Sequence, residues 1–385
     1  MQRYYFDHNA TTPVSPEVCE AMAPCLAEVY GNPSSIHHFG QMAKQRLEAA
    51  RRQIAALVNA HPQEIVFTGG GTESDNLAIL GVARGGRKHV IATAIEHPAV
   101  LNTCAQLERE GAEVTVLQTG ADGVLDPGDV RRALRPHTAL VSVMHANNEI
   151  GVVQPVAEIA RIAHEAGALM HVDGVQALGK IPVDVKALDV DLYSASGHKI
   201  YAPKGIGMLY ARKDTPLQAV TFGGHHERDR RPGTENVAGA VALGRAAELA
   251  RASLEIEPAR LSRLRDRLER AILERVPFTG VNGNRNSRTP NTTNIYFDHV
   301  EGEAMVISLD LRGFAVSSGA ACSSGAVEPS HVLLAIGLAP ERARSSIRFS
   351  LGRANTEEQV DALVEAVVES IAHLRRLSPQ SHAHV

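Results

Sequence analysis

The sequence predicts an α/β protein with a large, doubly wound, mostly parallel sheet and a second, smaller α+β domain. Between Glu64 and Val172, short apolar runs alternate with amphipathic helical stretches, which is typical of a parallel sheet covered on both faces. After Gly233 this alternation ends, and strands and helices follow in a mixed order. The length of 385 residues also exceeds what a single hydrophobic core usually supports.

The elements of the large domain, residues 16–257, follow from this pattern. The segment before it, residues 1–15, is expected to be mostly extended and to pack with the smaller domain, and a helix is expected over 41–59. Strands are expected over 64–68, 89–92, 113–118, 139–144 and 169–172, and helices over 72–83, 98–110, 126–134 and 155–166. Because such sheets bind ligands at the carboxyl ends of their strands, polar residues that follow a strand are candidates for a site.

The smaller domain is expected over residues 258–385. The helical stretch from Val237 to Leu273 should break near Pro258, since proline cannot continue a helix from its interior. Beyond it we expect strands over 293–297, 315–317 and 346–350, and helices over 303–311 and 356–377.

Composition, charge and cysteine spacing argue against several classes of function. The net charge is −4 with no long basic block, which gives no case for nucleic acid, and no apolar run approaches a membrane span. The N-terminus lacks a signal-peptide pattern. Four scattered cysteines suit a reducing cytoplasm rather than a disulfide framework, and Cys19, Cys25 and Cys104 are expected in the core. No zinc-type spacing occurs among the histidines and cysteines, so no metal site is expected.

One lysine stands out in residues 194–207. Lys199 follows a hydroxyl-rich turn and precedes the glycines Gly205 and Gly207. Such an amine could lie at the mouth of a sheet and form a Schiff base with an aldehyde cofactor. The alternative is a lysine on a surface loop, and this turn alone leaves both open.

Three successive strand ends carry polar groups. Asp173 could pair with a protonated ring nitrogen, or be a helix cap or an internal salt-bridge partner. His97 could stack on a flat ring or move a proton, or be an ordinary loop histidine. Asn148 ends the strand between them. Together they favour a ligand site more than any one does alone.

Two further features suggest anion recognition. The turn Gly69–Gly71 precedes a helix, whose first amides could bind a phosphate, although Thr72 and Asp75 also fit a capping box. Arg348 lies in a strand-like run and needs an acidic partner, either an amino-acid carboxylate or an internal acid.

Cys322 lies in a run of small residues, 317–327, that is expected to form a mobile loop. A thiol there could be a nucleophile, and the alternative is an incidental cysteine.

These motifs resemble a known family. Ser196-Gly197-His198-Lys199, with Asp173-Gly174-Val175-Gln176 and Gly71-Thr72-Glu73-Ser74 upstream, is similar to the class V aminotransferases, which are pyridoxal 5′-phosphate (PLP) enzymes of fold type I. Further motifs resemble the cysteine desulfurases of the iron–sulfur cluster assembly type, at residues 10–13, 147–151, 231–236 and 321–325. The resemblance extends from about Tyr4 to about Leu377.

The resemblance implies a role for each residue. Lys199 would form the Schiff base with PLP and move the Cα proton, Asp173 would keep the pyridine nitrogen protonated, and His97 would stack on the ring as a catalytic residue. Gln176 and Asn148 would contact the phenolic oxygen, with Asn148 also near the substrate. The phosphate would be held by Gly71, Thr72, Ser196, His198 and, from the other subunit of a homodimer, Thr234. Arg348 would bind the substrate carboxylate, and Cys322 would accept the sulfur.

The implied activity is that of a cytoplasmic cysteine desulfurase. It would convert L-cysteine to L-alanine and pass the Cys322 persulfide to a sulfur acceptor or an iron–sulfur scaffold protein, for cluster assembly or tRNA thiolation. One alternative is a selenocysteine lyase or another class V transaminase or lyase. Another is a PLP-binding docking module for sulfur transfer with weak turnover.

Overall fold

The computed structural model describes residues 2–86, 88–318 and 328–377. At its centre is a seven-stranded sheet with the strand order β2-β8-β7-β6-β5-β3-β4. Its strands are β2 (Ile65–Thr68), β3 (His89–Thr93), β4 (Glu113–Leu117), β5 (Thr138–Ser142), β6 (Leu169–Asp173), β7 (Leu192–Ser196) and β8 (Gly207–Ala211). The pairs from β4 through β3, β5 and β6 to β7 are parallel, which confirms the predicted doubly wound, mostly parallel sheet.

Strand β8 runs against both of its neighbours, β7 and β2. The connection from β7 contains only the short helix η2 (Gly197–Lys199) and a turn with Gly205 at φ +81°, so it is too short for the crossover that a parallel pair needs. In β8, a Cβ on Gly207 would lie 2.6 Å from the Cα of Gly70, so this hairpin packs directly on the glycine turn before α4. Lys199 is therefore held at the carboxyl end of β7.

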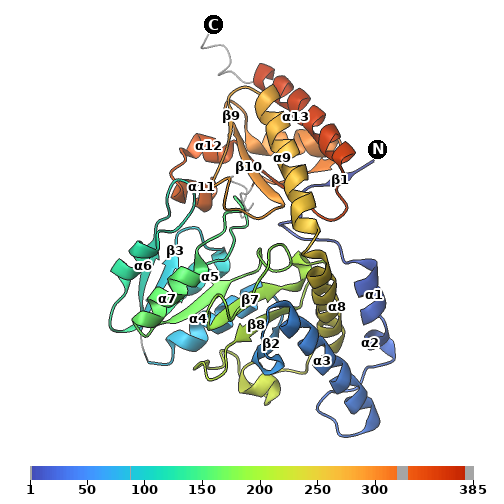
Figure 1. The fold of residues 1–385 in the computed structure, drawn as a ribbon, viewed down its shortest axis with the longest axis vertical. Helices are drawn as coiled ribbons and strands as arrows, with labels where there is room; N and C mark the ends of the chain where they lie inside the picture. Colours follow the sequence, from blue (N-terminus) through green and yellow to red (C-terminus); the bar gives the residue numbers. More distant parts are fainter. Residues whose placement is uncertain (1, 87, 319–327, 378–385) are drawn as a thin grey trace.

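Helices cover both faces of this sheet (Figure 1). The helices of this part of the chain are α1 (Pro16–Met22), α2 (Pro24–Ala27), α3 (His38–Leu57), α4 (Gly71–Ala83), α5 (Pro98–Arg109), α6 (Pro127–Ala133), α7 (Val156–Glu165) and α8 (Val237–Ser253). Of these, α1 and α2 pack against α8 rather than on the sheet (Figure 1). The side chains of β3 alternate between two hydrophobic clusters: Ile91 joins the one that contains Ile54 of α3, while Val90 joins the one that contains Leu77 of α4. Burial on both faces explains why these strands are apolar throughout.

The second sheet is antiparallel, with β10 (Thr292–Phe297) between β12 (Ser346–Ser350) and β9 (Thr279–Val281). Its other elements are α9 (Glu257–Arg275), α10 (Gly302–Leu311), β11 (Phe314–Ala315), α11 (His331–Ala335), α12 (Pro340–Arg344) and α13 (Glu357–Leu377). Its own hydrophobic cluster includes Phe6 from the N-terminal segment, whose strand β1 (Tyr4–Tyr5) pairs with β11 (Figure 1). We propose the division of the chain into 1–15, 16–257 and 258–385.

Some local expectations need correction. The helix expected over 41–59 begins three residues earlier, at His38, where the His37 side chain accepts a hydrogen bond from the Gly40 amide. The long helical stretch breaks before Glu257, and Pro258 lies in the first turn of α9, where its missing N–H is not needed. Cys25 and Cys104 are buried as predicted, but Cys19 is exposed, because it lies on the outer face of the short helix α1.

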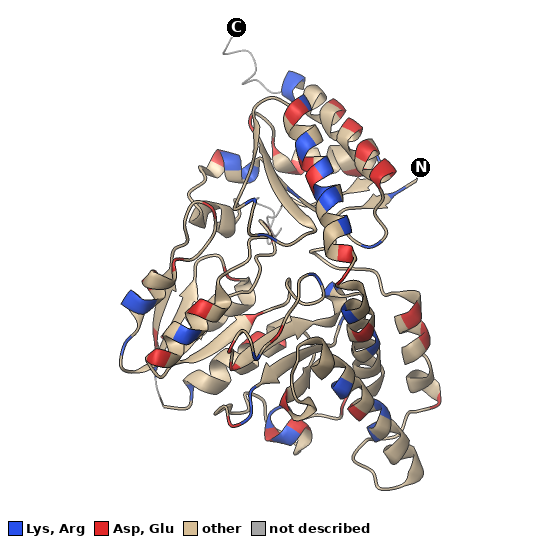
Figure 2. Ribbon diagram, viewed as in Figure 1, with Lys and Arg blue, Asp and Glu red and all other residues tan. Residues whose placement is uncertain are grey.

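Charges of both signs are mixed over the helices of the smaller sheet (Figure 2). Arg267 and Arg275 on α9 pair with Asp361 and Glu365 on α13, at 2.7 and 2.5 Å. Over the described ranges, no helix has the length and apolar character needed to cross a membrane. The same residues contain no group of three or more His, Cys, Asp or Glu side chains arranged to hold a metal ion.

Candidate active site

A cavity of about 320 Å³ lies at the carboxyl ends of the central strands. It collects nearly all of the residues that the sequence singled out: Gly71, Thr72, His97, Asn148, Asp173, Gln176, Ser196, His198, Lys199 and Arg348. Thr234 is exposed and is not among the lining residues, and Cys322 lies outside the described residues. The cavity thus joins residues that are as distant in sequence as Gly71 and Arg348.

Asp173 is the last residue of β6, and its side chain reaches the cavity floor. Its Oδ1 accepts a hydrogen bond from the Val175 amide at 3.0 Å. Burial raises the pKa of Asp173, while that amide and the nearby His97 and Lys199 oppose the increase. A buried carboxylate with an open side toward the cavity is suited to a cationic partner there.

Lys199 lines the same cavity, so the alternative of a lysine on a surface loop is wrong. Its Nζ donates to the main-chain carbonyl oxygens of Asn9 and Ala10, both at 2.7 Å. Burial lowers the pKa of Lys199 to about 8; the positive charge of Arg348 acts in the same direction, and Asp7 and Asp173 oppose it. An amine with this pKa has a substantial neutral fraction near neutrality and can act as a nucleophile or a base.

The N-terminus of α4 forms one end of the cavity. Gly70, the residue before the helix, has φ +153° and caps it without a side chain. A Cβ on Gly71 would lie 2.7 Å from Cγ2 of Val175, so the bare backbone makes room at this end. Helix amides next to the hydroxyl of Ser196 are suited to a phosphate.

The capping box considered for Thr72 and Asp75 is wrong. The acid that contacts the turn before the helix is Glu73. It accepts a hydrogen bond from the Gly69 amide at 2.6 Å and forms an ion pair with Arg231 at 2.8 Å. Asp75 instead lines the cavity, and its buried Oδ1 has no hydrogen-bond partner. Burial raises the pKa of Asp75 well above its ordinary value, and the neighbouring Asp173 adds to this.

Two histidines line the cavity. His97 is the N-cap of α5, where its Nδ1 accepts from the Ala99 amide at 3.1 Å. His198 has its Nδ1 3.1 Å from the Thr11 hydroxyl oxygen. Burial lowers the pKa of both rings, that of His198 to about 4. Both rings are therefore neutral at physiological pH.

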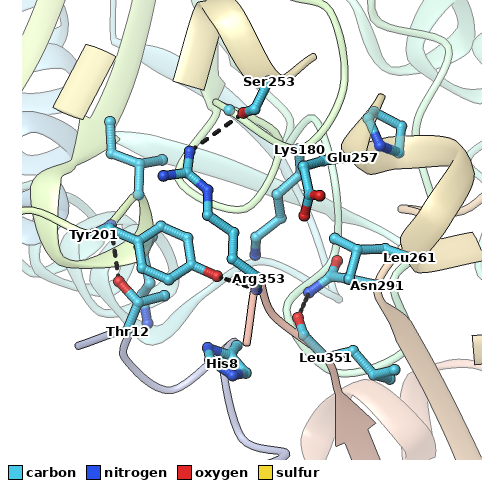
Figure 3. A pocket seen from close by; sticks show the side chains of 14 residues that line it. His8, Thr12, Lys180, Tyr201, Ser253, Glu257, Leu261, Asn291, Leu351 and Arg353 are labelled. Atoms are coloured by element: carbon cyan, nitrogen blue, oxygen red, sulfur yellow. Dashed lines mark hydrogen bonds between the residues drawn. The ribbon is translucent and has the colours of Figure 1, made fainter. Parts of the chain in front are cut away.

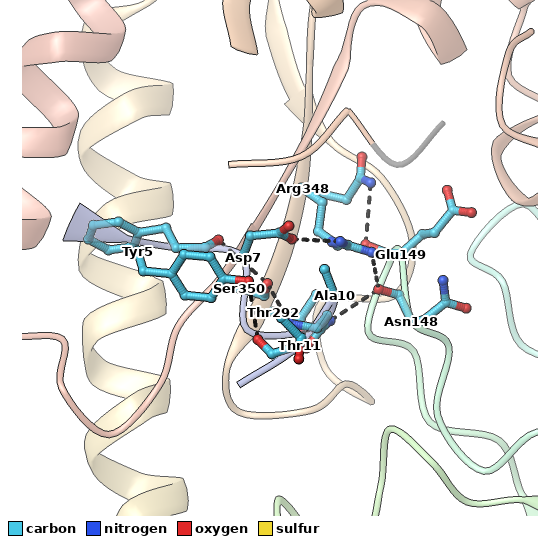
Figure 4. A network of polar contacts seen from close by, with 12 residues as sticks. Tyr5, Asp7, Ala10, Thr11, Asn148, Glu149, Thr292, Arg348 and Ser350 are labelled. Atoms are coloured by element: carbon cyan, nitrogen blue, oxygen red, sulfur yellow. Dashed lines mark hydrogen bonds and ion pairs between the residues drawn. The ribbon is translucent and has the colours of Figure 1, made fainter. Parts of the chain in front are cut away.

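Arg348 crosses from the smaller sheet to the cavity (Figure 4). Its Nη2 donates to Asp7 at 2.7 Å and its Nη1 to the carbonyl oxygen of Asn148 at 3.0 Å. Of the two partners considered for this arginine, the structure shows the internal acid. Each of the two Nη nitrogens carries a second hydrogen, so the guanidinium retains capacity for a further anion.

Asn9 and Asp7 were not predicted as site residues. Asn9 is 2% exposed, and its carbonyl oxygen accepts from both Lys199 and Gln176. Its Nδ2 donates to the carbonyl oxygen of Asn148 at 3.1 Å and to Thr292 at 2.9 Å. The available signal was a run of polar residues directly before the turn at residues 10–13.

The chain matches known proteins over nearly its whole length. The family "Aminotransferase class-V" matches residues 4–363. A cysteine desulfurase from Trichormus azollae is 50% identical over 381 residues, which cover 98% of this chain and 95% of the relative. The cysteine desulfurase IscS of Anaeromyxobacter dehalogenans is also 50% identical over 381 residues, covering 97% and 94%.

Solved structures agree. A NifS-like protein superimposes with a TM-score of 0.91 at 36% identity, covering 97% of this chain and all of that one. A structure described as SspA in complex with cysteine gives a TM-score of 0.81 at 37% identity, covering 90% and 98%.

Proposed function

The chain belongs to the class-V aminotransferase family, and from that premise we propose that it is a cysteine desulfurase. Such an enzyme removes sulfur from L-cysteine, releases L-alanine and holds the sulfur as a persulfide. The family depends on PLP, and this chain is a PLP-dependent enzyme. The observation that carries the proposal is the meeting of the Lys199 amine, the Asp173 carboxylate and the Arg348 guanidinium in one cavity.

The residues present fit PLP. The cavity of about 320 Å³ has an amine with a lowered pKa at Lys199 for the aldehyde carbon, and the Asp173 carboxylate for a protonated ring nitrogen. The amides at Gly71 and Thr72, together with Ser196 and His198, would hold the phosphate. When bound, PLP supplies an electron-accepting ring that stabilises negative charge at the substrate Cα.

The remaining roles belong to side chains of this chain. Arg348 binds the substrate carboxylate through the Nη hydrogens that Asp7 and the Asn148 carbonyl oxygen leave free. Lys199 takes the proton from the substrate Cα, since burial keeps part of its amine neutral. His97 would stack on the ring, while Asn148 and Gln176 would contact the phenolic oxygen, since all three line the cavity.

We propose Cys322 as the sulfur acceptor on the basis of its sequence motif and of the similarity to cysteine desulfurases. Its thiolate attacks the substrate sulfur, a new S–S bond forms, the C–S bond breaks, and its electron pair passes to the substrate carbon. The structure of SspA with cysteine supports L-cysteine as the substrate. The persulfide then goes to an acceptor, either a scaffold for iron–sulfur clusters or a protein of tRNA thiolation.

We propose a homodimer in which Thr234 completes the phosphate site of the other subunit. Two observations support it: Thr234 is exposed and away from its own cavity, and Ile36 and Phe222 are 95% and 89% exposed although apolar. A cytoplasmic location is proposed on the cysteine usage.

The test is product formation by the purified protein with bound PLP, a thiol reductant and L-cysteine. We expect alanine and sulfide in equal amounts over many turnovers. Cys322→Ser should retain the absorbance of bound PLP and lose sulfide release, whereas Cys19→Ser, which changes an exposed cysteine outside the cavity, should behave as the wild type. Unchanged sulfide release by Cys322→Ser would reject the persulfide. A preference for L-selenocysteine, or a single turnover only, would favour the alternatives.

A further inference from the structure

A second lysine, Lys180, lies behind Gln176 and does not line the cavity itself. We propose that Lys180 is a positioning residue, which orients the side-chain amide of Gln176 so that its nitrogen, rather than its oxygen, is presented to the phenolic oxygen of PLP. This inference rests on the proposed function, because it assumes that PLP occupies the cavity.

The hydrogen bonds around Gln176 determine the orientation of its amide. Lys180 Nζ donates to Oε1 of Gln176 and, at 3.0 Å, to Oδ1 of Asn9. On its other side, Nε2 of Gln176 donates to the carbonyl oxygen of Asn9 at 2.9 Å. The Asn9 carbonyl oxygen only accepts, and the Lys180 nitrogen already donates to two oxygens, so a flipped amide would place its oxygen against the Asn9 carbonyl and its NH2 group against the lysine nitrogen.

This orientation has a consequence inside the cavity. The amide nitrogen of Gln176 carries two hydrogens, and the bond to Asn9 uses one of them. The second is available to the cavity that Gln176 lines. A donor at this position stabilises a deprotonated phenolic oxygen, whereas an amide oxygen would repel it.

The surroundings of Lys180 explain why it can hold the Gln176 amide in one orientation. The charges that act on it most strongly are those of Lys199 and Arg348, both positive, and together with burial they lower its pKa well below the ordinary value. The two amide oxygens are therefore its compensating partners. Asn9 is itself fixed, because its Oδ1 also accepts from Asn291 at 3.1 Å. Figure 3 shows Lys180 extending along a second cavity, of about 30 Å³, which Lys199 also lines.

The first experiment compares Lys180→Met with Arg353→Met. Arg353 lines the same small cavity, but it contacts Tyr201 and Ser253 instead of Gln176. The readouts are the dissociation constant of PLP for the apo-protein and the absorption spectrum of bound PLP. We expect Lys180→Met to weaken PLP binding about 10-fold and to shift the absorption band, because the loss of one buried hydrogen bond has about this effect. Arg353→Met should leave both unchanged.

A double-mutant cycle tests whether Lys180 acts through Gln176. If it does, Lys180→Met should add nothing to the effect of Gln176→Leu on the spectrum and the affinity. Additive effects, or a wild-type spectrum for Lys180→Met, would overturn the inference. Should Lys180→Met fail to fold, Gln176→Glu provides the test: its carboxylate pairs with Lys180 and leaves no donor, so an unchanged PLP affinity would overturn the inference. Failure of the wild type to bind PLP would reject the proposed function instead.

Discussion

The two walls of the cavity are held in different ways. On the large-sheet wall, Asp173 and Ser196 end buried parallel strands, and His97 caps α5. Their positions follow from main-chain hydrogen bonds of the sheet and the helix. On the opposite wall, Arg348 comes from the smaller sheet and meets Asp7 of the N-terminal segment. The main chain of Arg348 is fixed within its own sheet, but the end of its side chain is oriented by the ion pair with Asp7 and by a hydrogen bond to the Asn148 carbonyl oxygen.

This difference assigns separate tasks to the two walls. A sheet fixes its strand ends rigidly, which suits groups that must match a bound ring to within a fraction of an ångström. A contact between two sheets can adjust, which suits recognition of a substrate that enters and leaves. Substitutions on the large-sheet wall should therefore lower turnover, and substitutions on the opposite wall should mainly alter substrate affinity and the state of Lys199.

The strongest test of the large-sheet wall is Lys199→Ala. It removes the amine that is proposed to move the Cα proton, so alanine formation should fall at least about 10³-fold, within the range for loss of a general base. Lys204→Ala is the matched control, because Lys204 is an exposed lysine of the same hairpin, and it should retain wild-type turnover. Comparable losses in both variants would show that the hairpin, rather than the amine, matters.

The next largest effect is expected for Asp173→Asn. An amide cannot hold a ring nitrogen protonated, whereas an adjacent opposite charge shifts a pKa by about one to three units. Turnover should fall on the order of 10²-fold while PLP remains bound, as measured by initial rates and the absorbance of the cofactor. A wild-type rate would contradict the role of the large-sheet wall.

The features that were predicted from sequence depend on local patterns. Apolar runs identified the parallel strands, strand ends identified Asp173, and a hydroxyl-rich turn followed by glycines identified Lys199. Residues fixed by distant partners escaped prediction: Asn9 acquires its role only when Lys199, Gln176 and Thr292 come together around it. The capping box failed for a similar reason, because Glu73 rather than Asp75 reaches the start of α4, and sequence spacing does not distinguish them. Asn9 and Asp7 of the N-terminal segment were thus the harder residues to predict.

On that opposite wall, Arg348→Lys should change substrate affinity. Lysine keeps the positive charge but cannot contact Asp7, the Asn148 carbonyl and a substrate carboxylate with one planar group. We expect KM for L-cysteine to rise about 10-fold with a smaller change in kcat, since the loss of a charge-assisted hydrogen bond has about this effect. Arg342→Lys, on the surface against Asp298, is the control. A fall in kcat as large as the rise in KM would show that Arg348 acts in turnover, like the residues of the large-sheet wall.

The smallest effect is expected for the pKa of Lys199, which is influenced by two charged residues of the opposite wall, Arg348 and Asp7. Burial is the main cause that lowers this pKa to about 8, Arg348 lowers it further, and Asp7 raises it. In the apo-protein, only the neutral amine adds to an aldehyde, so the rate of addition of pyridoxal should rise with pH and level off above about 8. The adduct on Lys199 can be measured by reduction and peptide mass spectrometry.

Neutralising Arg348 and neutralising Asp7 should shift the midpoint of this pH dependence in opposite directions. Arg348→Met removes a positive charge, which favours the protonated amine, so the midpoint should rise. Asp7→Asn removes a negative charge, so the midpoint should fall and addition below it should become faster, by less than about 10-fold for a shift under one unit. Lys204→Ala should leave the midpoint unchanged. If both Arg348→Met and Asp7→Asn shift the midpoint in the same direction, the substitutions act through the shape of the cavity, and the opposite wall does not tune the amine by charge.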